Sequence, residues 1–233
     1  LDEVEFEDNP EPRCAVVLLL DVSASMSGQP ISELNQGLQD FEQTLKTDAL
    51  ASLRVEVAVV TFGSAVQAID VREGGFQPIP FDAQQAFVTA DQFCAPTLAT
   101  SGLTPMGEAL RKSLQLLKER KNIYKQNGID YFRPWMFLIT DGGPNDEWES
   151  AATQVREEED RKGVVLYAVG VEGADMQTLA RFCDPKRQPL KLKGLAFREL
   201  FQWLSKSLSG VSQSRPGEQV PLPPPAGWAQ LET

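Results

Sequence analysis

The stretch CAVVLLLD at residues 14–21 constrains the fold of this chain more than any other feature of its sequence. Its apolar residues follow one another without polar alternation and end at one carboxylate, Asp21. Such a run is typical of a strand buried on both faces, because a half-exposed strand alternates apolar with polar residues. Two further runs of this kind are PWMFLITDG (134–142) and VVLYAVGV (164–171). The chain therefore needs covering helices on both faces of a sheet.

Amphipathic segments separate these apolar runs. In ISELNQGLQDFEQTLK (31–46), apolar residues recur at steps of three and four, which predicts a helix with one buried stripe. Similar patterns predict helices at 104–126, 147–163, 174–183 and 195–211. Strands that alternate with helices along a chain form a parallel sheet with helices on its faces.

Other segments predict the edges of this sheet. Residues 53–63 and 65–71 are rich in β-branched residues and are separated by a short Gly-Ser turn, which predicts an antiparallel hairpin at one edge. PLKLKG (189–194) predicts one more strand, whereas 74–102 is poorly periodic and predicts a loop-rich excursion. We therefore expect an α/β, Rossmann-like fold, with a mostly parallel central sheet, one antiparallel edge strand and helices on both faces.

The chain has 233 residues, which is long enough for one substantial domain. We expect an acidic N-terminal arm at 1–12, the domain at 13–211 and a Pro-rich tail at 212–233. The tail lacks core periodicity, so it either drapes over the domain or waits for a partner.

Composition excludes several classes of function. The net charge of −11 gives no general attraction to nucleic acid or anionic membranes. The chain has no histidine, which excludes Ser-His-Asp and Cys-His triads. Its three cysteines lie far apart, which argues against a disulfide framework and a zinc ribbon. No apolar run approaches the ~18 residues that span a bilayer, so we expect a cytoplasmic protein.

Oxygen-bearing side chains gather at the predicted strand ends. Asp21 and Asp141 follow two apolar runs, Ser23 and Ser25 come just after the first, and Thr104 begins a helix. Because ligands of open parallel sheets bind at the carboxyl ends of the strands, these side chains could form one site. Oxygen donors favour Mg²⁺ or Mn²⁺, with Ca²⁺ less favoured. Alternatively, the hydroxyls cap helices or turns, and the carboxylates lie at helix N-termini without a metal.

This combination closely resembles the von Willebrand factor A (VWA) domain with its metal-ion-dependent adhesion site (MIDAS). The family motif D-x-S-x-S stands here as DVSAS (21–25), its distant threonine as Thr104 in SGLTP, and its last aspartate as Asp141 in ITDGGP. All five positions match, and the resemblance covers about residues 13–210. More narrowly, SASMSGQPISELNQGL, GIDYFRPWMFLITDG and LKLKGLAFRELFQWLSKSLSGVSQSRPGE resemble bacterial VWA proteins of the tellurite-resistance TerY group.

The resemblance implies a Rossmann-like VWA fold in which Ser23 and Ser25 coordinate the metal directly. Thr104, Asp21 and Asp141 would coordinate it directly or through water, and an acidic side chain of a partner protein would complete the coordination sphere. It also implies a scaffold role in a bacterial stress or tellurite-resistance system.

We therefore predict a non-enzymatic, metal-dependent protein-binding module that recruits an Asp or Glu of a partner. One alternative is a Mg²⁺-dependent phosphatase with Asp21 as nucleophile. That chemistry needs a second acid two residues later, where this chain has Ser23. The other alternative is a metal-free structural adaptor.

Overall fold

The computed structural model describes residues 9–225 and 227–230, so most of the acidic arm predicted at 1–12 lies outside the described residues. One mixed sheet runs through the described part of the chain, in the order β4-β3-β2-β1-β6-β7-β8-β9. Its central strands are mutually parallel, and they are β2 (Val55–Phe62), β1 (Cys14–Asp21), β6 (Trp135–Thr140), β7 (Val165–Gly170) and β8 (Leu190–Leu192). The α/β class and the mostly parallel sheet are confirmed.

Antiparallel pairings occur at both ends of this sheet. The predicted hairpin is confirmed, since β3 (Val66–Ile69) pairs antiparallel with β2 and is followed by β4 (Pro78–Ile79). Three short strands were not predicted: β4, which lies in the expected loop-rich excursion, β5 (Val88–Thr89), which pairs with β2, and β9 (Ala229–Gln230), which pairs with β8. Strands of two residues carry no periodicity from which to predict them.

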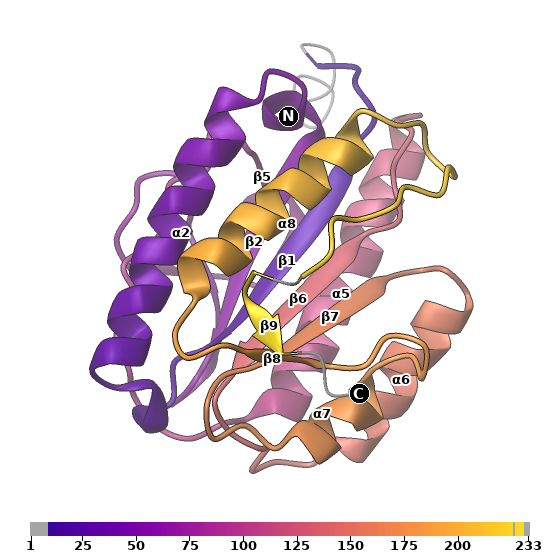
Figure 1. Cartoon of the computed structure of the whole chain (residues 1–233). Helices are drawn as coiled ribbons and strands as arrows, with labels where there is room; N and C mark the ends of the chain where they lie inside the picture. The colour runs from indigo at the N-terminus through magenta and orange to yellow at the C-terminus, as the bar shows by residue number, and fades with distance from the viewer. Residues whose placement is uncertain (1–8, 226, 231–233) are drawn as a thin grey trace.

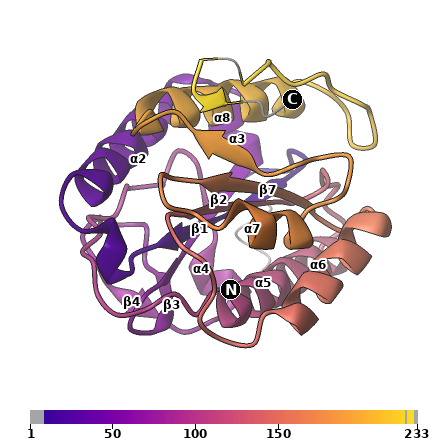
Figure 2. The same cartoon turned by 60° about the horizontal axis from the view of Figure 1, so that its bottom comes forward.

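Helices cover both faces of the sheet (Figures 1 and 2). On one face lie α2 (Gln29–Thr47) and α8 (Phe197–Ser212), and on the other lie α5 (Met106–Gln126) and α6 (Glu149–Asp160). The shorter helices are η1 (Ala24–Met26), α3 (Ala51–Arg54), α4 (Ala83–Ala86) and α7 (Met176–Phe182). The helices predicted from periodicity are thus all present, with ends shifted by at most three residues.

Strand β1 forms the centre of two cores. Leu18 and Leu20 pack in the core beneath α2 and α8, whereas Val17 and Leu19 pack in the core beneath α5 and α6. Every residue of β1 is buried, as the unbroken apolar run predicts. Burial on both faces therefore fixes the position of Asp21, the last residue of β1.

The described part of the tail packs on the domain. Trp228 is buried and its ring lies 5.3 Å from that of Trp203 on α8. The indole nitrogen of Trp203 donates a hydrogen bond of 2.7 Å to the carbonyl oxygen of Pro223. Of the two possibilities left open for the tail, the structure shows that it drapes over the domain, whereas the domain boundaries themselves stay a prediction.

Replacing Trp228 tests this packing. We expect Trp228→Ala to lower the free energy of unfolding by about 3–5 kcal/mol, because it removes a large buried side chain and leaves a cavity. Urea denaturation followed by circular dichroism measures the loss. A change within experimental error would contradict the packing of the tail on α8.

A buried ionic cluster lies at the amino ends of the parallel strands, whereas Asp21 lies at the carboxyl end of β1. Glu56, near the start of β2, accepts hydrogen bonds from Arg13 at 3.0 Å and from Arg120 at 2.7 and 2.9 Å. Tyr124 also donates to Glu56, and all four side chains are buried. Buried charges are tolerated only when they are paired and hydrogen-bonded, so this cluster ties β2, α5 and the entry to β1 together.

We expect Glu56→Gln to destabilise the protein by about 3–5 kcal/mol, because it removes the carboxylate to which both guanidinium groups are bonded. A matched control is Glu108→Gln, which breaks the exposed pair with Lys112 and should cost at most about 1 kcal/mol. Chemical denaturation of both variants gives the comparison. Equal losses would show that the buried cluster has no special role in stability.

Candidate metal centre

The two aspartates lie side by side because their strands are neighbours. Strands β1 and β6 pair in parallel with Leu20 opposite Ile139. Asp21 is the last residue of β1, and Asp141 follows the last residue of β6, Thr140. The predicted meeting of the two strand ends is therefore present in the structure.

The serines after β1 connect the two carboxylates through hydrogen bonds. Ser25 Oγ donates to Asp141 Oδ1 at 2.7 Å and lies 2.9 Å from Ser23 Oγ. The backbone N–H of Ser23 donates to Asp21 Oδ1 at 2.7 Å, and the hydroxyl of Thr140 donates to Asp21 Oδ2 at 2.5 Å. Four of the five predicted site residues are thus connected by hydrogen bonds, and the link between Asp21 and Ser23 runs through the backbone N–H of Ser23.

Thr104 completes the group. Its Oγ1 lies 3.6 Å from the position that a Cβ on Gly142 would occupy, so its hydroxyl faces the residue that follows Asp141. The structure therefore brings all five predicted residues to one edge of the sheet. Their assignment as metal ligands stays a prediction.

Neither Thr104 nor Ser23 caps a helix with its hydroxyl. The N-cap residue of α5 is Pro105, and the helix's N–H groups at Gly107 and Glu108 are bonded by the carboxylate of Asp146 at 2.9 and 2.7 Å, not by Thr104. Ser23 precedes η1 without a side-chain capping bond. Helix capping therefore does not explain the positions of Ser23 and Thr104.

Electrostatics make this cluster a site of negative potential. Asp21 is fully buried, and burial raises its pKa; hydrogen bonds from Ser23 and Thr140 oppose this, and the charge of Asp141 adds to it. In the described part of the chain, neither carboxylate forms an ion pair with a basic side chain. A cation would relieve both the burial cost and the repulsion between the two acids.

The donor set fits a hard divalent cation. It consists of two carboxylates and three hydroxyls, and no cluster of three or more His, Cys, Asp or Glu occurs among the described residues. Hard cations such as Mg²⁺ accept such all-oxygen sets, whereas Zn²⁺ prefers nitrogen and sulfur. The residues present thus suit Mg²⁺ or Mn²⁺.

Sequence reasoning missed three residues that position the site. Thr140 holds Asp21, as described above. Asn145 accepts from the N–H of Thr104 through its Oδ1 and donates its own N–H to the carbonyl of Thr104, both at 3.1 Å. The carboxylate of Asp146 accepts the N–H groups of Gly107 and Glu108 and so holds the first turn of α5 next to the site. Thr140 could have been noticed beside Asp141, but Asn145 and Asp146 follow Gly-Gly-Pro and look like ordinary loop residues.

The match of this chain to a protein-family model establishes its relationship to known proteins. The model of the von Willebrand factor type A domain matches residues 15–198. The chain belongs to the VWA family. No curated protein sequence matches this VWA domain.

Solved structures with the same fold are distant in sequence. Proximal thread matrix protein 1 (PTMP1) from the mussel byssus is 19% identical over 88% of this chain and 46% of its own, with a TM-score of 0.54. The pilus adhesin SpaC of Lactobacillus rhamnosus GG is 14% identical over 87% of this chain and 31% of its own, with a TM-score of 0.63. The manganese-loaded TRAP protein of Plasmodium vivax is 20% identical over 81% and 73% of the two chains, with a TM-score of 0.52.

At these identities the likeness shows the fold alone. The chain spans about half the length of PTMP1 and about a third of SpaC. PTMP1 has also been solved with a zinc-occupied MIDAS motif, at 18% identity and a TM-score of 0.50. Among the described residues, each helix is too short or too polar to cross a bilayer.

Asp21→Asn separates a structural from a metal-binding role of this carboxylate. Without metal, we expect the variant to be at least as stable as the wild type, because it removes a buried charge. The amide oxygen can still accept from the N–H of Ser23, and the amide N–H can donate to the hydroxyl of Thr140 in place of the bond that this hydroxyl donates to Asp21. Thermal unfolding in EDTA measures this. A loss of several kcal/mol would instead show that the carboxylate serves the fold.

Proposed function

We propose that this VWA domain is a non-enzymatic protein-binding module that holds a divalent cation and, through it, recruits an Asp or Glu side chain of a partner. The observation that carries the proposal is the position of Ser25 Oγ, which lies within hydrogen-bond distance of both Ser23 Oγ and Asp141 Oδ1, while Asp21 accepts the backbone N–H of Ser23. Thr104 lies beside the same group.

The chemistry of the donors supports recruitment of an anion. Hydroxyl oxygens give a cation no full negative charge, so a metal held by Ser23, Ser25 and Thr104 stays electrophilic and accepts an external carboxylate. Asp21 and Asp141 compensate part of the charge. We assign Ser23 and Ser25 as direct ligands and Thr104, Asp21 and Asp141 as direct or water-mediated ligands, with Mg²⁺ as the preferred ion and Mn²⁺ as its substitute.

The phosphatase alternative has little support from the site. A nucleophilic carboxylate must reach its substrate, whereas Asp21 is 0% exposed and both of its oxygens accept hydrogen bonds. The residue two positions later is Ser23, which cannot act as a general acid at neutral pH. The metal-free adaptor is less favoured because the two neighbouring carboxylates lack a basic partner in the described structure.

The narrower resemblance to the TerY group leads us to propose a cytoplasmic scaffold role in a bacterial stress or tellurite-resistance system. Support for this comes only from the sequence stretches that carry the resemblance. Loss of tellurite tolerance on deletion of the gene, restored by the wild type but not by Ser25→Ala, is the corresponding test.

Thermal unfolding with and without cations tests the metal site. A cation at ~100 times its Kd stabilises the folded state by about 2.7 kcal/mol, which raises Tm by about 5–10 °C in a domain of this size. We expect this shift for the wild type on replacing EDTA by Mg²⁺ or Mn²⁺, a smaller one with Ca²⁺, and none for Ser25→Ala. Ser27→Ala is the matched control, because Ser27 lies two residues on and bonds Thr100 instead of the site.

The same variants test the recruitment of carboxylates. A partner captured in Mg²⁺ should be released by EDTA, and it should fail to bind Ser25→Ala but still bind Ser27→Ala. Substitution of the acidic residues in its binding segment should abolish capture. Equal binding in EDTA and Mg²⁺ would refute the proposal and favour the metal-free adaptor.

A further inference from the structure

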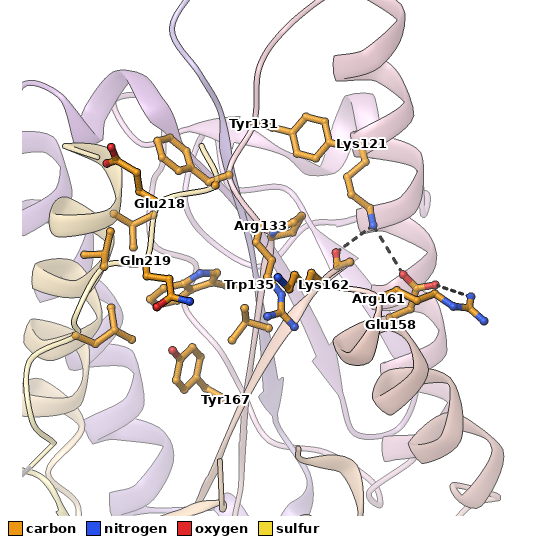
Figure 3. A pocket seen from close by; sticks show the side chains of 18 of the residues that line it. Lys121, Tyr131, Arg133, Trp135, Glu158, Arg161, Lys162, Tyr167, Glu218 and Gln219 are labelled. Carbon is orange, nitrogen blue, oxygen red and sulfur yellow. Dashed lines mark hydrogen bonds and ion pairs between the residues drawn. The ribbon is translucent and has the colours of Figure 1, made fainter. Parts of the chain in front are cut away.

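A cavity lies far from the candidate metal centre. It has a volume of about 880 Å³ and is lined by Trp135 and Val165, the first residues of β6 and β7. The metal centre lies at the carboxyl ends of the parallel strands, whereas this cavity lies at their amino ends. In Figure 3, Glu218 and Gln219 of the tail lie on one side of this cavity and Lys121 and Glu158 on the other.

Basic side chains dominate the lining of this cavity. The lining includes two acidic residues, Glu158 and Glu218, and six basic ones, Lys121, Lys125, Arg133, Arg161, Lys162 and Arg187. The chain as a whole carries a net charge of −11, so this concentration of cations runs against its composition. A concave surface lined by one sign of charge concentrates ions of the opposite sign.

Glu158 does not neutralise its basic neighbours. It lies 3.2 Å from Lys118, 3.8 Å from Lys121 and 4.0 Å from Arg161, and Arg161 also lies 3.7 Å from Glu157, so three cations share two carboxylates. Burial lowers the pKa of Lys121, with Lys125 and Lys118 adding to the effect against the opposing charge of Glu158. Positive charge therefore remains in excess on this side of the cavity.

Arg133 is a half-buried cation held only by neutral groups. Its Nε donates to the carbonyl of Val164 at 2.7 Å, and its Nη2 donates to the carbonyl of Glu159 at 2.8 Å. Within the described ranges, no carboxylate lies within ion-pair distance of it. A guanidinium has five N–H donors, so three remain for a ligand.

Lys162 occupies a backbone position that suits glycine. Its φ of 59° makes it the one non-glycine residue with positive φ among the residues described. Its N–H bonds the carbonyl of Glu159, and the N–H of Gly163 bonds that of Glu158, as in a Schellman motif at the end of α6. Glycine is the usual residue there because a Cβ strains this conformation. A lysine thus places a cation at the cavity at the expense of stability, and such conflicts cluster at functional sites.

We propose that this cavity binds a phosphate-bearing small anion. Arg133 bonds the phosphate through its free N–H groups, and Lys121 and Lys162 add charge from two other segments of the chain. Trp135, Val220 and Leu222 line the cavity and provide apolar surface for an organic portion of the ligand. The volume is that of a small-molecule site.

Calorimetric titration of the intact chain tests the proposal. The protein is first treated with EDTA and dialysed into metal-free buffer, so that the result is independent of the metal centre. The probes are ATP, inorganic triphosphate and citrate. Both phosphates should bind; tighter binding of ATP assigns an organic ligand, and equal binding assigns the phosphate chain alone. Citrate binding as tight as that of triphosphate, or no binding of either phosphate at millimolar concentration, overturns the proposal.

Three variants locate the binding. Arg133→Gln should weaken phosphate binding about tenfold or more, because it removes charge-assisted hydrogen bonds. Lys162→Gly should raise Tm without ligand and still weaken binding several-fold, so its effect cannot come from misfolding. Arg181→Gln, an exposed position on α7 away from the cavity, should bind as the wild type does. Wild-type affinity in both cavity variants overturns the proposal.

Discussion

The burial of β1 on both faces is the constraint on which the rest of this structure depends. Parallel pairing with β2 and β6 satisfies its backbone, and two separate cores cover its alternate side chains. Because a one-residue shift in register would move each side chain of this strand into the opposite core, the position of Asp21 at its end is fixed. Asp141 is placed beside it by the same parallel register with β6. The candidate site is therefore a consequence of how the core is packed.

The carboxyl ends and the amino ends of the parallel strands differ in chemistry. At the carboxyl edge, oxygen donors converge without a basic partner in the described structure, and this favours a cation. At the amino edge, arginines and lysines gather: some are bonded to the buried Glu56, and others line the cavity beneath the tail. Eight basic side chains of an acidic chain thus lie on the side away from the metal centre. This separation keeps the acidic cluster and the basic cavity from neutralising each other.

Much of this arrangement could be predicted because it rests on local patterns. The period of the apolar residues indicates the helices, and the unbroken runs indicate buried strands whose ends carry Asp21 and Asp141. The pairing of Asn145 with Thr104 could not be predicted in this way, since the residues are far apart in the sequence and each resembles a loop residue. The buried Glu56 cluster was missed for the same reason: a lone glutamate in a β-branched strand gives no sign of the arginines that will meet it.

The sequence by itself determined the fold class, the family and the identity of the five oxygen-bearing residues, because strand and helix periods and a short motif are local properties. Only the tertiary structure decided that Thr104 and Ser23 do not cap helices, and that the tail adds strand β9 beside β8. It also decided that cations from α5, from the segment before β6 and from the end of α6 line one cavity. These features depend on contacts between distant segments. Such contacts form only when burial of the two cores brings the segments together.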